Sequence, residues 1–179
     1  AYTSKGAKVN SDNRFNGKFE NFPLTVWQQS LDINLSGAFF CSQTFGEIMS
    51  KQKKGVIVNI ASTYGLVGAD QRIYGKSSLN LPVSYAASKG GVVSLSRSIA
   101  RAFGKDGITC FVVAPGWVKT DMAEDSIKEF GEEFILQGNA LDRLTEPADI
   151  APMVTLLASG LADHATGTSI DINAASYVH

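Results

Sequence analysis

Two short runs of β-branched residues, with a helical period between them, constrain the fold of this chain more than any other feature. Residues 56–60 and 108–114 are nearly unbroken apolar runs, the pattern of strands buried on both faces of a parallel sheet. Between them, apolar residues recur at helical spacing from about 84 to 104. A strand, a helix and a second strand predict a right-handed crossover and therefore an α/β fold.

The N-terminal part of the chain predicts a loop followed by a helix. Residues 1–24 are polar, are punctuated by Gly, Asn and Pro, and indicate a connecting loop. Thr25 and Gln28 form a capping-box pattern, which is typical of a helix start. Apolar residues then follow at helical spacing, and residues 51–55 end the helix.

The C-terminal part predicts a flap, a helix and a last strand. Residues 121–144 are mixed and charged, and we interpret them as one or two short helices in a substrate flap. Thr145 is expected to cap the next helix, with Pro147 in its first turn and Gly160 at its end. The alternating segment 168–172 predicts a partly exposed strand. Residues 1–179 are therefore expected to form a single domain.

The composition argues against several classes of function. A net charge of -1 and a pI near 6.1 supply no long-range field that would attract nucleic acid. Cys41 and Cys110 lie far apart without a CxxC spacing, so we expect no metal site and no disulfide, but a reduced, cytoplasmic setting. The apolar runs are each a few residues long, too short for a membrane span. We expect a soluble protein that binds neither nucleic acid nor membrane.

Tyr85 and Lys89 are the first candidates for chemistry. They stand four residues apart at the start of the helix expected at 84–104, so both project from one face. An unperturbed tyrosine has a pKa of about 10, and an adjacent ammonium lowers it by favouring the phenolate. Lys89 would thus tune Tyr85 as a general acid/base. The pair alone also fits a half-buried tyrosine beside a solvated lysine.

Ser62 and Asn34 are two further polar candidates. Ser62 follows the strand predicted at 56–60, so its hydroxyl lies at the edge of the sheet where open α/β folds bind ligands. A turn-forming serine fits this position equally well. Asn34 is a polar amide inside a predicted helix, where asparagine is disfavoured because its side chain competes for backbone hydrogen bonds. Asn34 on an exposed helix face is the alternative.

Four motifs in order resemble the classical short-chain dehydrogenase/reductase family, from about Phe19 to the C-terminus. Residues 32–37 (DINLSG) are similar to its helix asparagine motif, and residues 58–62 (VNIAS) to its serine strand. Residues 85–89 (YAASK) resemble its catalytic signature, and residues 114–120 (APGWVKT) its nicotinamide-side loop. The chain resembles 3-oxoacyl-reductase-like and polysaccharide-linked members of this family, and the resemblance implies the C-terminal part of a Rossmann-type doubly wound parallel sheet.

The resemblance also implies a role for each candidate. Tyr85 would give a proton to a carbonyl oxygen in reduction and remove it in oxidation, while Ser62 hydrogen-bonds the same oxygen. Lys89 would lower the pKa of Tyr85 and hold the nicotinamide ribose, and Asn34 would anchor a water that relays protons through Lys89. The cofactor, NAD or NADP, would contact the following residues: Tyr85, Lys89, Pro115, Gly116, Val118 and Thr120.

The chain departs from the family in three places. It has no glycine-rich turn for the cofactor pyrophosphate, so we expect it to be part of a longer protein, since residues 56–60 alone would form an aggregation-prone edge. An insert at 71–76 is expected over the active-site mouth, where Arg72 and Lys76 either meet an anionic group or stay solvated. Residues 174–175 are alanines where the family commonly has glycine.

The leading hypothesis is an NAD(P)-dependent oxidoreductase that acts on a small carbonyl or alcohol substrate. A sugar epimerase or dehydratase of the extended branch is one alternative, although only a short segment follows Thr120. A non-catalytic chain that serves assembly is the other. The resemblance implies a homo-oligomer, a dimer or homotetramer, and small residues such as Gly90, Gly91 and Ser94 would let a second helix approach. Ordinary packing on the sheet would explain the same residues.

Overall fold

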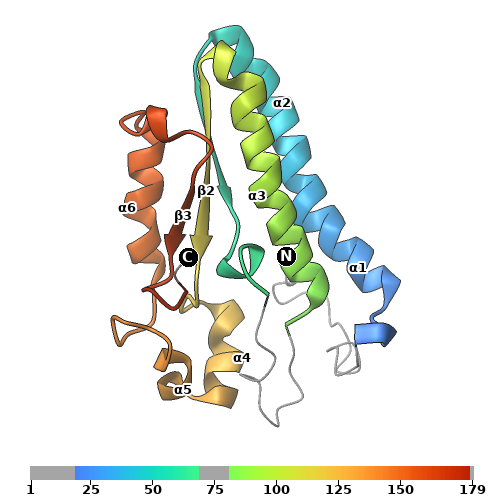
Figure 1. The fold of residues 1–179 in the computed structure, drawn as a ribbon, viewed down its shortest axis with the longest axis vertical. Coiled ribbons are helices and arrows are strands. Elements are labelled where there is room, and N and C mark those ends of the chain that lie inside the picture. Colours follow the sequence, from blue (N-terminus) through green and yellow to red (C-terminus); the bar gives the residue numbers. More distant parts are fainter. Residues whose placement is uncertain (1–18, 69–80, 178–179) are drawn as a thin grey trace.

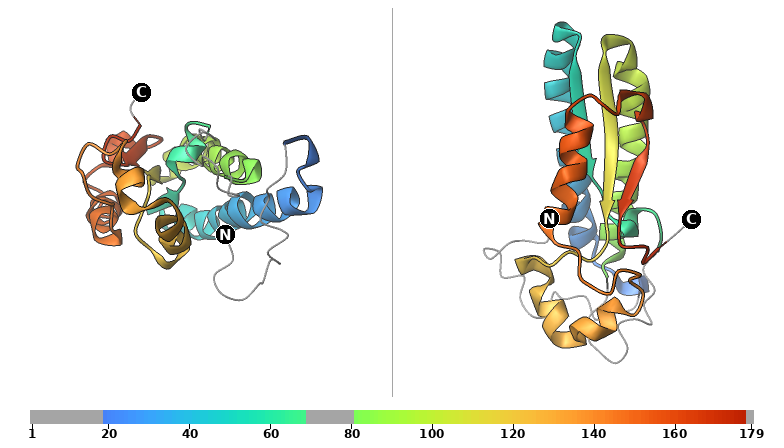
Figure 2. Two further views of the ribbon diagram at one scale, coloured as in Figure 1. Left: turned by 90° about the horizontal axis from the view of Figure 1, so that it is seen from below. Right: turned by 90° about the vertical axis from the view of Figure 1, so that its left-hand side faces the viewer.

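The computed structural model describes residues 19–68 and 81–177, and their centre is a parallel three-stranded sheet. Helices lie on both faces of this sheet and beyond the carboxyl ends of its strands (Figure 1, Figure 2). The strands run in the order β1 (Gly55–Ile60), β2 (Ile108–Pro115), β3 (Ser169–Ile172). The helices are α1 (Leu24–Leu31), α2 (Gly37–Gln52), α3 (Val83–Phe103), α4 (Asp121–Phe130), α5 (Glu132–Leu136) and α6 (Pro147–Ala158). The predicted α/β class is confirmed.

The central strand β2 forms the core of the domain. Phe111, Val112 and Val113 are fully buried, as the β-branched pattern predicts for a strand covered on both faces. Helices α2 and α3 cover one face of the sheet, and α6 covers the other (Figure 2). In the described residues β1 pairs only with β2, so its other edge carries no strand, and Ile60 at its end is 46% exposed.

The helix predicted from Thr25 is interrupted by a wide turn. Residues Asp32–Ser36 form a π-helical turn between α1 and α2, in which the Gly37 amide bonds the Asp32 carbonyl five residues earlier. Such turns are rare and frequently lie at functional sites. The periodicity indicates a helix throughout but carries no sign of this turn, because a single wide turn hardly changes the spacing of apolar residues.

Two predicted helix caps are wrong. Helix α1 begins at Leu24 behind Pro23, whose extended ψ of 127° ends the preceding segment, and Thr25 therefore lies inside the first turn. Helix α6 is capped by Glu146, whose backbone N–H donates to the Asp149 carboxylate at 2.8 Å. Thr145 instead bridges Val118 in extended conformation.

Some of the other sequence predictions are confirmed, and others fall on residues that the structure does not describe. Strand β3, helix α3, the end of α6 before Gly160, and two short helices within 121–144 are confirmed. The 1–18 part of the predicted loop and the 71–76 insert, with Arg72 and Lys76, lie outside the described residues. Residues Phe19–Asn21, expected in a loop, form one 3₁₀ turn.

Small residues on α3 are explained by packing within the chain. A Cβ on Gly91 would lie 2.8 Å from a methyl group of Leu35 in the π turn, and one on Gly90 would lie 3.3 Å from the Gly65 carbonyl oxygen. Ser96 is fully buried and accepts a hydrogen bond from the Asn59 amide at 2.9 Å. Only Ser94 of this group faces solvent. The close approach of α3 to its own neighbours therefore accounts for Gly90, Gly91 and Ser96, but not for Ser94.

Candidate active site

The predicted site residues gather where the parallel strands end. Ser62 follows β1, the Pro115-Gly116 segment ends β2, and Tyr85 lies in the first turn of α3. The strand arrows, the start of α3 and helix α4 all meet at this end of the molecule (Figure 1). Open α/β sheets bind their ligands at this edge.

Ser62 is held rigidly between β1 and a short 3₁₀ turn. Its backbone is extended, with φ of -170° and ψ of 156°, and its hydroxyl accepts a hydrogen bond from the Tyr64 amide at 3.2 Å. The residue is 7% exposed. Ser62 therefore both forms the turn and places its hydroxyl at the strand end. This hydroxyl lies beside Tyr85 on α3.

The Tyr85 phenol lies beside the Ser62 hydroxyl. Burial raises the pKa of the Tyr85 phenol, the hydrogen bond with the Ser62 side chain lowers it, and the neighbouring Tyr64 raises it. Burial has the largest effect, so the pKa of Tyr85 lies above its ordinary value. The structure does not show the lowering of the Tyr85 pKa that was expected from Lys89. The phenol therefore keeps its proton at neutral pH.

The position of the Lys89 ammonium explains why the pKa of Tyr85 is not lowered as expected. Nζ is 5.8 Å from the centroid of the Tyr85 ring and donates to the Ile60 carbonyl oxygen at 2.9 Å. The charge is therefore engaged at the end of β1, over the ring and away from a direct bond to the phenol. Burial lowers the pKa of Lys89 itself, because the charged form is disfavoured away from water.

Asn34 lies against α3. The π turn points its amide Nδ2 at Ser88 Oγ, 3.0 Å away on α3, and the residue is half-buried. The exposed-face alternative is thereby excluded. Ser88 is fully buried and its hydroxyl donates to the Tyr85 carbonyl oxygen at 2.8 Å. Asn34 is thus linked to Tyr85 through Ser88, a residue to which the sequence pattern gave no role.

The loop after β2 is fixed on both sides. The Pro115 carbonyl accepts a bond from Thr63 Oγ1 at 3.3 Å, and the Gly116 amide donates to the Ile172 carbonyl at 3.0 Å. A Cβ on Gly116 would lie 3.0 Å from the Asn173 side chain, so only glycine fits without displacement. This part of the predicted cofactor loop is pre-formed by β1 and β3.

Val118 and Thr120 continue this loop towards the flap. Val118 bridges Thr145, and the Lys119 amide donates to the Thr145 carbonyl at 2.8 Å. Thr120 is the residue before α4, and its hydroxyl donates to the Val118 carbonyl at 3.5 Å. The structure places both residues beyond the end of β2, on the same side of the sheet edge as α4.

Gly65 is a site residue that the sequence analysis missed. A Cβ there would lie 2.7 Å from the carbonyl carbon of Lys89 and 2.8 Å from its oxygen, with the Gly90 amide nitrogen at 3.0 Å. The turn after Ser62 therefore touches the backbone of α3. A glycine three residues after the strand-end serine was the available signal.

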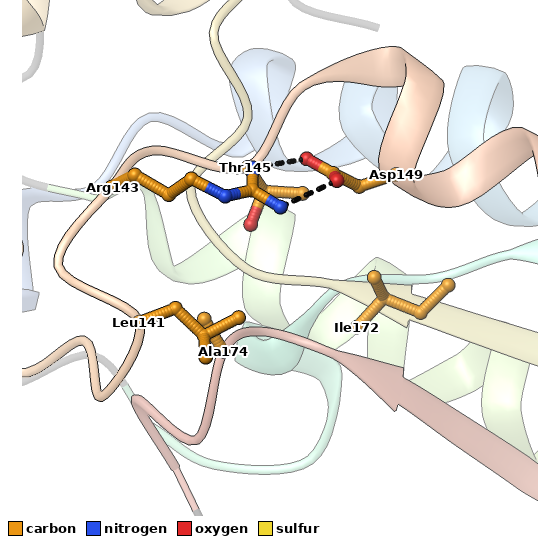
Figure 3. Close-up of a pocket in the computed structure, with 6 residues that line it drawn as sticks. All are labelled: Leu141, Arg143, Thr145, Asp149, Ile172 and Ala174. Atoms are coloured by element: carbon orange, nitrogen blue, oxygen red, sulfur yellow. Dashed lines mark hydrogen bonds and ion pairs between the residues drawn. The ribbon is translucent and has the colours of Figure 1, made fainter.

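A small pocket of about 90 Å³ lies next to this site, between the end of β3 and the start of α6. Figure 3 shows Arg143 reaching across its mouth to the Asp149 carboxylate, with both guanidinium-to-oxygen distances at 2.7 Å. The Arg143 partner lowers the pKa of Asp149. The pocket is lined by Leu141, Arg143, Thr145, Asp149, Ile172 and Ala174. None of these is a predicted catalytic residue, and the ion pair joins the flap segment to α6.

The described residues were also considered for a metal site and for a membrane-spanning helix. Within 19–68 and 81–177 no three His, Cys, Asp or Glu side chains are grouped closely enough to hold a metal ion. Over the same residues, none of the helices combines the length and apolar character needed to cross a membrane.

A family model described as enoyl-(acyl carrier protein) reductase matches residues 7–174. The chain therefore belongs to the classical short-chain dehydrogenase/reductase family, as the four motifs indicate. The 3-oxoacyl-(acyl-carrier-protein) reductase of Staphylococcus aureus is 35% identical over 152 residues, which cover 85% of this chain and 57% of the relative. The acetoacetyl-CoA reductase of an Acinetobacter species is 34% identical over 165 residues, 90% of this chain and 60% of the relative. The chain thus spans about three fifths of the length of these relatives.

Solved structures share the fold. The crystal structure of gox2181 superposes with a TM-score of 0.79 at 32% identity, covering 89% of this chain and 59% of that one. A structure of ElxO with NADP bound has a TM-score of 0.77 at 28% identity, over 88% of this chain and 60% of that one. The Rossmann-type sheet implied by the motifs is therefore confirmed for the part of the fold that this chain contains.

Proposed function

We propose that the protein containing this chain is an NAD(P)-dependent oxidoreductase that interconverts a carbonyl and a secondary alcohol. The observation that carries the proposal is the placement of the Tyr85 phenol beside the Ser62 hydroxyl, with the Lys89 ammonium over the Tyr85 ring, at the carboxyl ends of the strands. A protonated phenol next to a second hydroxyl is suited to receive a carbonyl oxygen and to give it a proton. The S. aureus and Acinetobacter relatives are reductases by name.

In the reductive direction, the Ser62 hydroxyl and the Tyr85 phenol both bond the substrate carbonyl oxygen. As hydride reaches the carbonyl carbon, that oxygen becomes basic and takes the Tyr85 proton, leaving an alcohol and a phenolate. The raised pKa of Tyr85 keeps the proton in place until then. Lys89 stabilises the phenolate by its charge, and Asn34 holds a water through which the phenol recovers its proton. Alcohol oxidation runs through the same steps in reverse.

The side chains at the strand ends suit the nicotinamide end of NAD or NADP. Among the described residues, Lys89 Nζ uses one of its three N–H groups on the Ile60 carbonyl, so two others can bond the ribose hydroxyls. The Pro115-Gly116 segment, Val118 and Thr120 would border the nicotinamide ring. When bound, the nicotinamide supplies or accepts the hydride. The pyrophosphate would be held outside the described residues.

A 3-oxoacyl thioester is the substrate class to test first. The reductases from S. aureus and Acinetobacter carry 3-oxoacyl and acetoacetyl groups in their names, and such groups present the ketone that the proposed chemistry needs. The flap formed by α4 and α5 stands over the strand ends, where it would cover such a substrate (Figure 1). Acetoacetyl-CoA, with NADPH and NADH in separate assays, is a defined probe for this class.

The test is the Tyr85→Phe variant of the full-length protein. Removing the proton donor is expected to lower turnover of acetoacetyl-CoA by ~10²- to 10⁴-fold, the usual contribution of general acid catalysis. Turnover is followed by the loss of reduced-nicotinamide absorbance, and circular dichroism checks that the variant is folded.

Tyr64→Phe is the matched control. It removes a second phenol near Tyr85 and keeps the Tyr64 backbone N–H that bonds the Ser62 hydroxyl. We expect it to keep turnover within about threefold, since no proton transfer passes through it. Near-normal turnover of Tyr85→Phe would overturn the proposal. A wild-type protein that binds neither NADPH nor NADH, measured by nicotinamide fluorescence, would favour a non-catalytic chain.

We propose further that the protein is a cytoplasmic homo-oligomer. Three apolar side chains on the outer face of α2, Phe40, Phe45 and Ile48, are 59%, 55% and 49% exposed, more than a surface helix usually leaves uncovered. Association of like subunits would cover them. Light scattering on the purified full-length protein decides between a monomer, a dimer and a tetramer.

A further inference from the structure

Two hydrogen-bonded rungs join α1 and the π turn to the first turns of α3. The first is between the hydroxyls of Ser30 and Ser84, 2.8 Å apart, and the second runs from the Asn34 amide to the Ser88 hydroxyl at 3.0 Å. The rungs are one helical turn apart on both sides, and Tyr85 stands between them on α3. Ser84 and Ser88 are both fully buried.

The second rung does more than join two helices. Ser88 Oγ accepts from Asn34 and donates to the Tyr85 carbonyl oxygen at 2.8 Å, so it connects a side chain of the π turn to the backbone of the catalytic tyrosine. Its surroundings are closed to water. Removing the hydroxyl would take this acceptor from the half-buried Asn34 amide and would break the bond from α3 to the Tyr85 carbonyl oxygen.

Tyr85 lies in the first turn of α3, where its backbone N–H bonds a residue that precedes the helix. The Tyr85 amide donates to the Pro82 carbonyl at 2.9 Å, and the Ala86 amide donates to the same oxygen at 3.5 Å. The Ser88 hydroxyl adds a side-chain bond to this turn through the Tyr85 carbonyl oxygen. The orientation of this turn determines whether the phenol reaches Ser62, because a small rotation about the helix axis displaces a long side chain considerably.

We propose that Ser88 is a positioning residue whose hydroxyl couples Asn34 to the Tyr85 backbone and so holds the Tyr85 phenol against Ser62. The inference rests on the proposed function and adds a residue to it. It also gives Asn34 a direct structural path to Tyr85, in addition to the water relay proposed above. In this reading, the π turn matters because it aims Asn34 at α3.

Serine hydroxyls often bond a carbonyl one turn earlier in a helix without any further role. Ser96 provides that comparison within the same helix. It is fully buried, donates to the Val92 carbonyl at 2.7 Å, and accepts from the Asn59 amide at 2.9 Å. Ser88 and Ser96 therefore have matching bonds and burial, and they differ in their distance along α3 from Tyr85.

The test compares Ser88→Ala with Ser96→Ala in the full-length protein. Both remove the same kind of hydroxyl and should destabilise the fold by similar amounts in urea unfolding. We expect Ser88→Ala to lower kcat for acetoacetyl-CoA by about 10- to 100-fold, as sub-ångström misplacement of a reacting group does, and Ser96→Ala to leave kcat within about threefold. Ser88→Thr, which keeps the hydroxyl, should recover most of the lost kcat.

A pH profile separates positioning from general destabilisation. Two titratable groups face the Tyr85 phenol, Lys89 over its ring and Tyr64 beside it. The Ser62 hydrogen bond lowers the pKa of Tyr85, so weakening that bond in Ser88→Ala should raise it. Alcohol oxidation needs the phenolate, and the rising limb of its rate should therefore move to higher pH in Ser88→Ala and not in Ser96→Ala.

A double variant tests the link to Asn34. If both residues act along one path, Asn34→Ala combined with Ser88→Ala should lower kcat no further than the more severe single change. Equal kcat values and pH profiles for Ser88→Ala and Ser96→Ala would overturn the positioning role while Tyr85→Phe remained inactive. An active Tyr85→Phe variant would instead overturn the proposed function, so the two failures are distinguishable.

Discussion

Replacing Gly65 with alanine should disturb both the stability and the chemistry of this protein. The added Cβ would lie 2.7 Å from the Lys89 carbonyl carbon and 2.8 Å from its oxygen. Both atoms belong to the backbone of α3 and cannot rotate away as a side chain would. The start of α3 or the turn after Ser62 must therefore move. These two segments carry Tyr85 and Ser62, the pair proposed to bind the substrate carbonyl oxygen.

The size of the effect follows from these distances. Carbon atoms pack best at about 3.5 to 4.0 Å, so relieving the contact with the Lys89 carbonyl carbon needs a shift of roughly 0.8 to 1.3 Å between the turn and α3. Overpacking of this kind typically destabilises a protein by about 1 to 3 kcal/mol. A 1 Å displacement of reacting groups costs roughly 100-fold in rate, so we expect kcat to fall by about 10- to 100-fold.

Gly68→Ala is the matched control, because a Cβ at Gly68 would meet nothing within 4 Å. Urea unfolding measures the loss of stability, and acetoacetyl-CoA reduction with saturating NADPH or NADH measures kcat. If Gly65→Ala matched Gly68→Ala in both measurements, the close approach of the Ser62 turn to α3 would be wrong, together with the inference that this contact sets the site geometry.

Two further predictions concern strain and thiol reactivity. Ala174 and Ala175 have left-handed φ angles of 50° and 58°, so replacing either with glycine should stabilise the protein by about 0.5 to 1 kcal/mol, and a lower urea midpoint would contradict this. Burial raises the pKa of Cys110 to about 11, whereas Cys41 is exposed. Iodoacetamide at neutral pH should therefore alkylate Cys41 first, and mass spectrometry of the peptides would reveal equal labelling if the burial of Cys110 were wrong.

The elements of the fold were largely predictable because each depends on its own residues. The β-branched runs before Ser62 and Gly116 indicate buried parallel strands, and the periodic segment around Tyr85 indicates a helix, as the structure confirms. The helix ends were less predictable. Thr25 and Thr145 have the side chains of caps, but Pro23 and Glu146 occupy the cap positions, since neighbouring segments determine where each helix begins.

The arrangement within the site depends on contacts between distant segments, which no local pattern contains. The bond between Asn34 and Ser88 joins residues on different helices and requires the π turn. The pKa of Tyr85 is governed by burial, and the direction of its shift could not be inferred from the spacing to Lys89 alone. The close approach at Gly65 likewise appears only when the turn after β1 meets α3.

The π turn at Asp32–Ser36 also separates the rotational phase of α1 from that of α2. Each residue of an α-helix advances the side-chain direction by about 100°, and a wide turn absorbs one extra residue. The α1 side can thus keep Ser30 directed at α3 while the α2 side presents Phe40 and Phe45 outwards. Deleting one residue of this turn would rotate one half of the helix against the other by about 100°, so that Ser30 and Phe40 could no longer both keep their present directions, while the helical content stayed nearly the same.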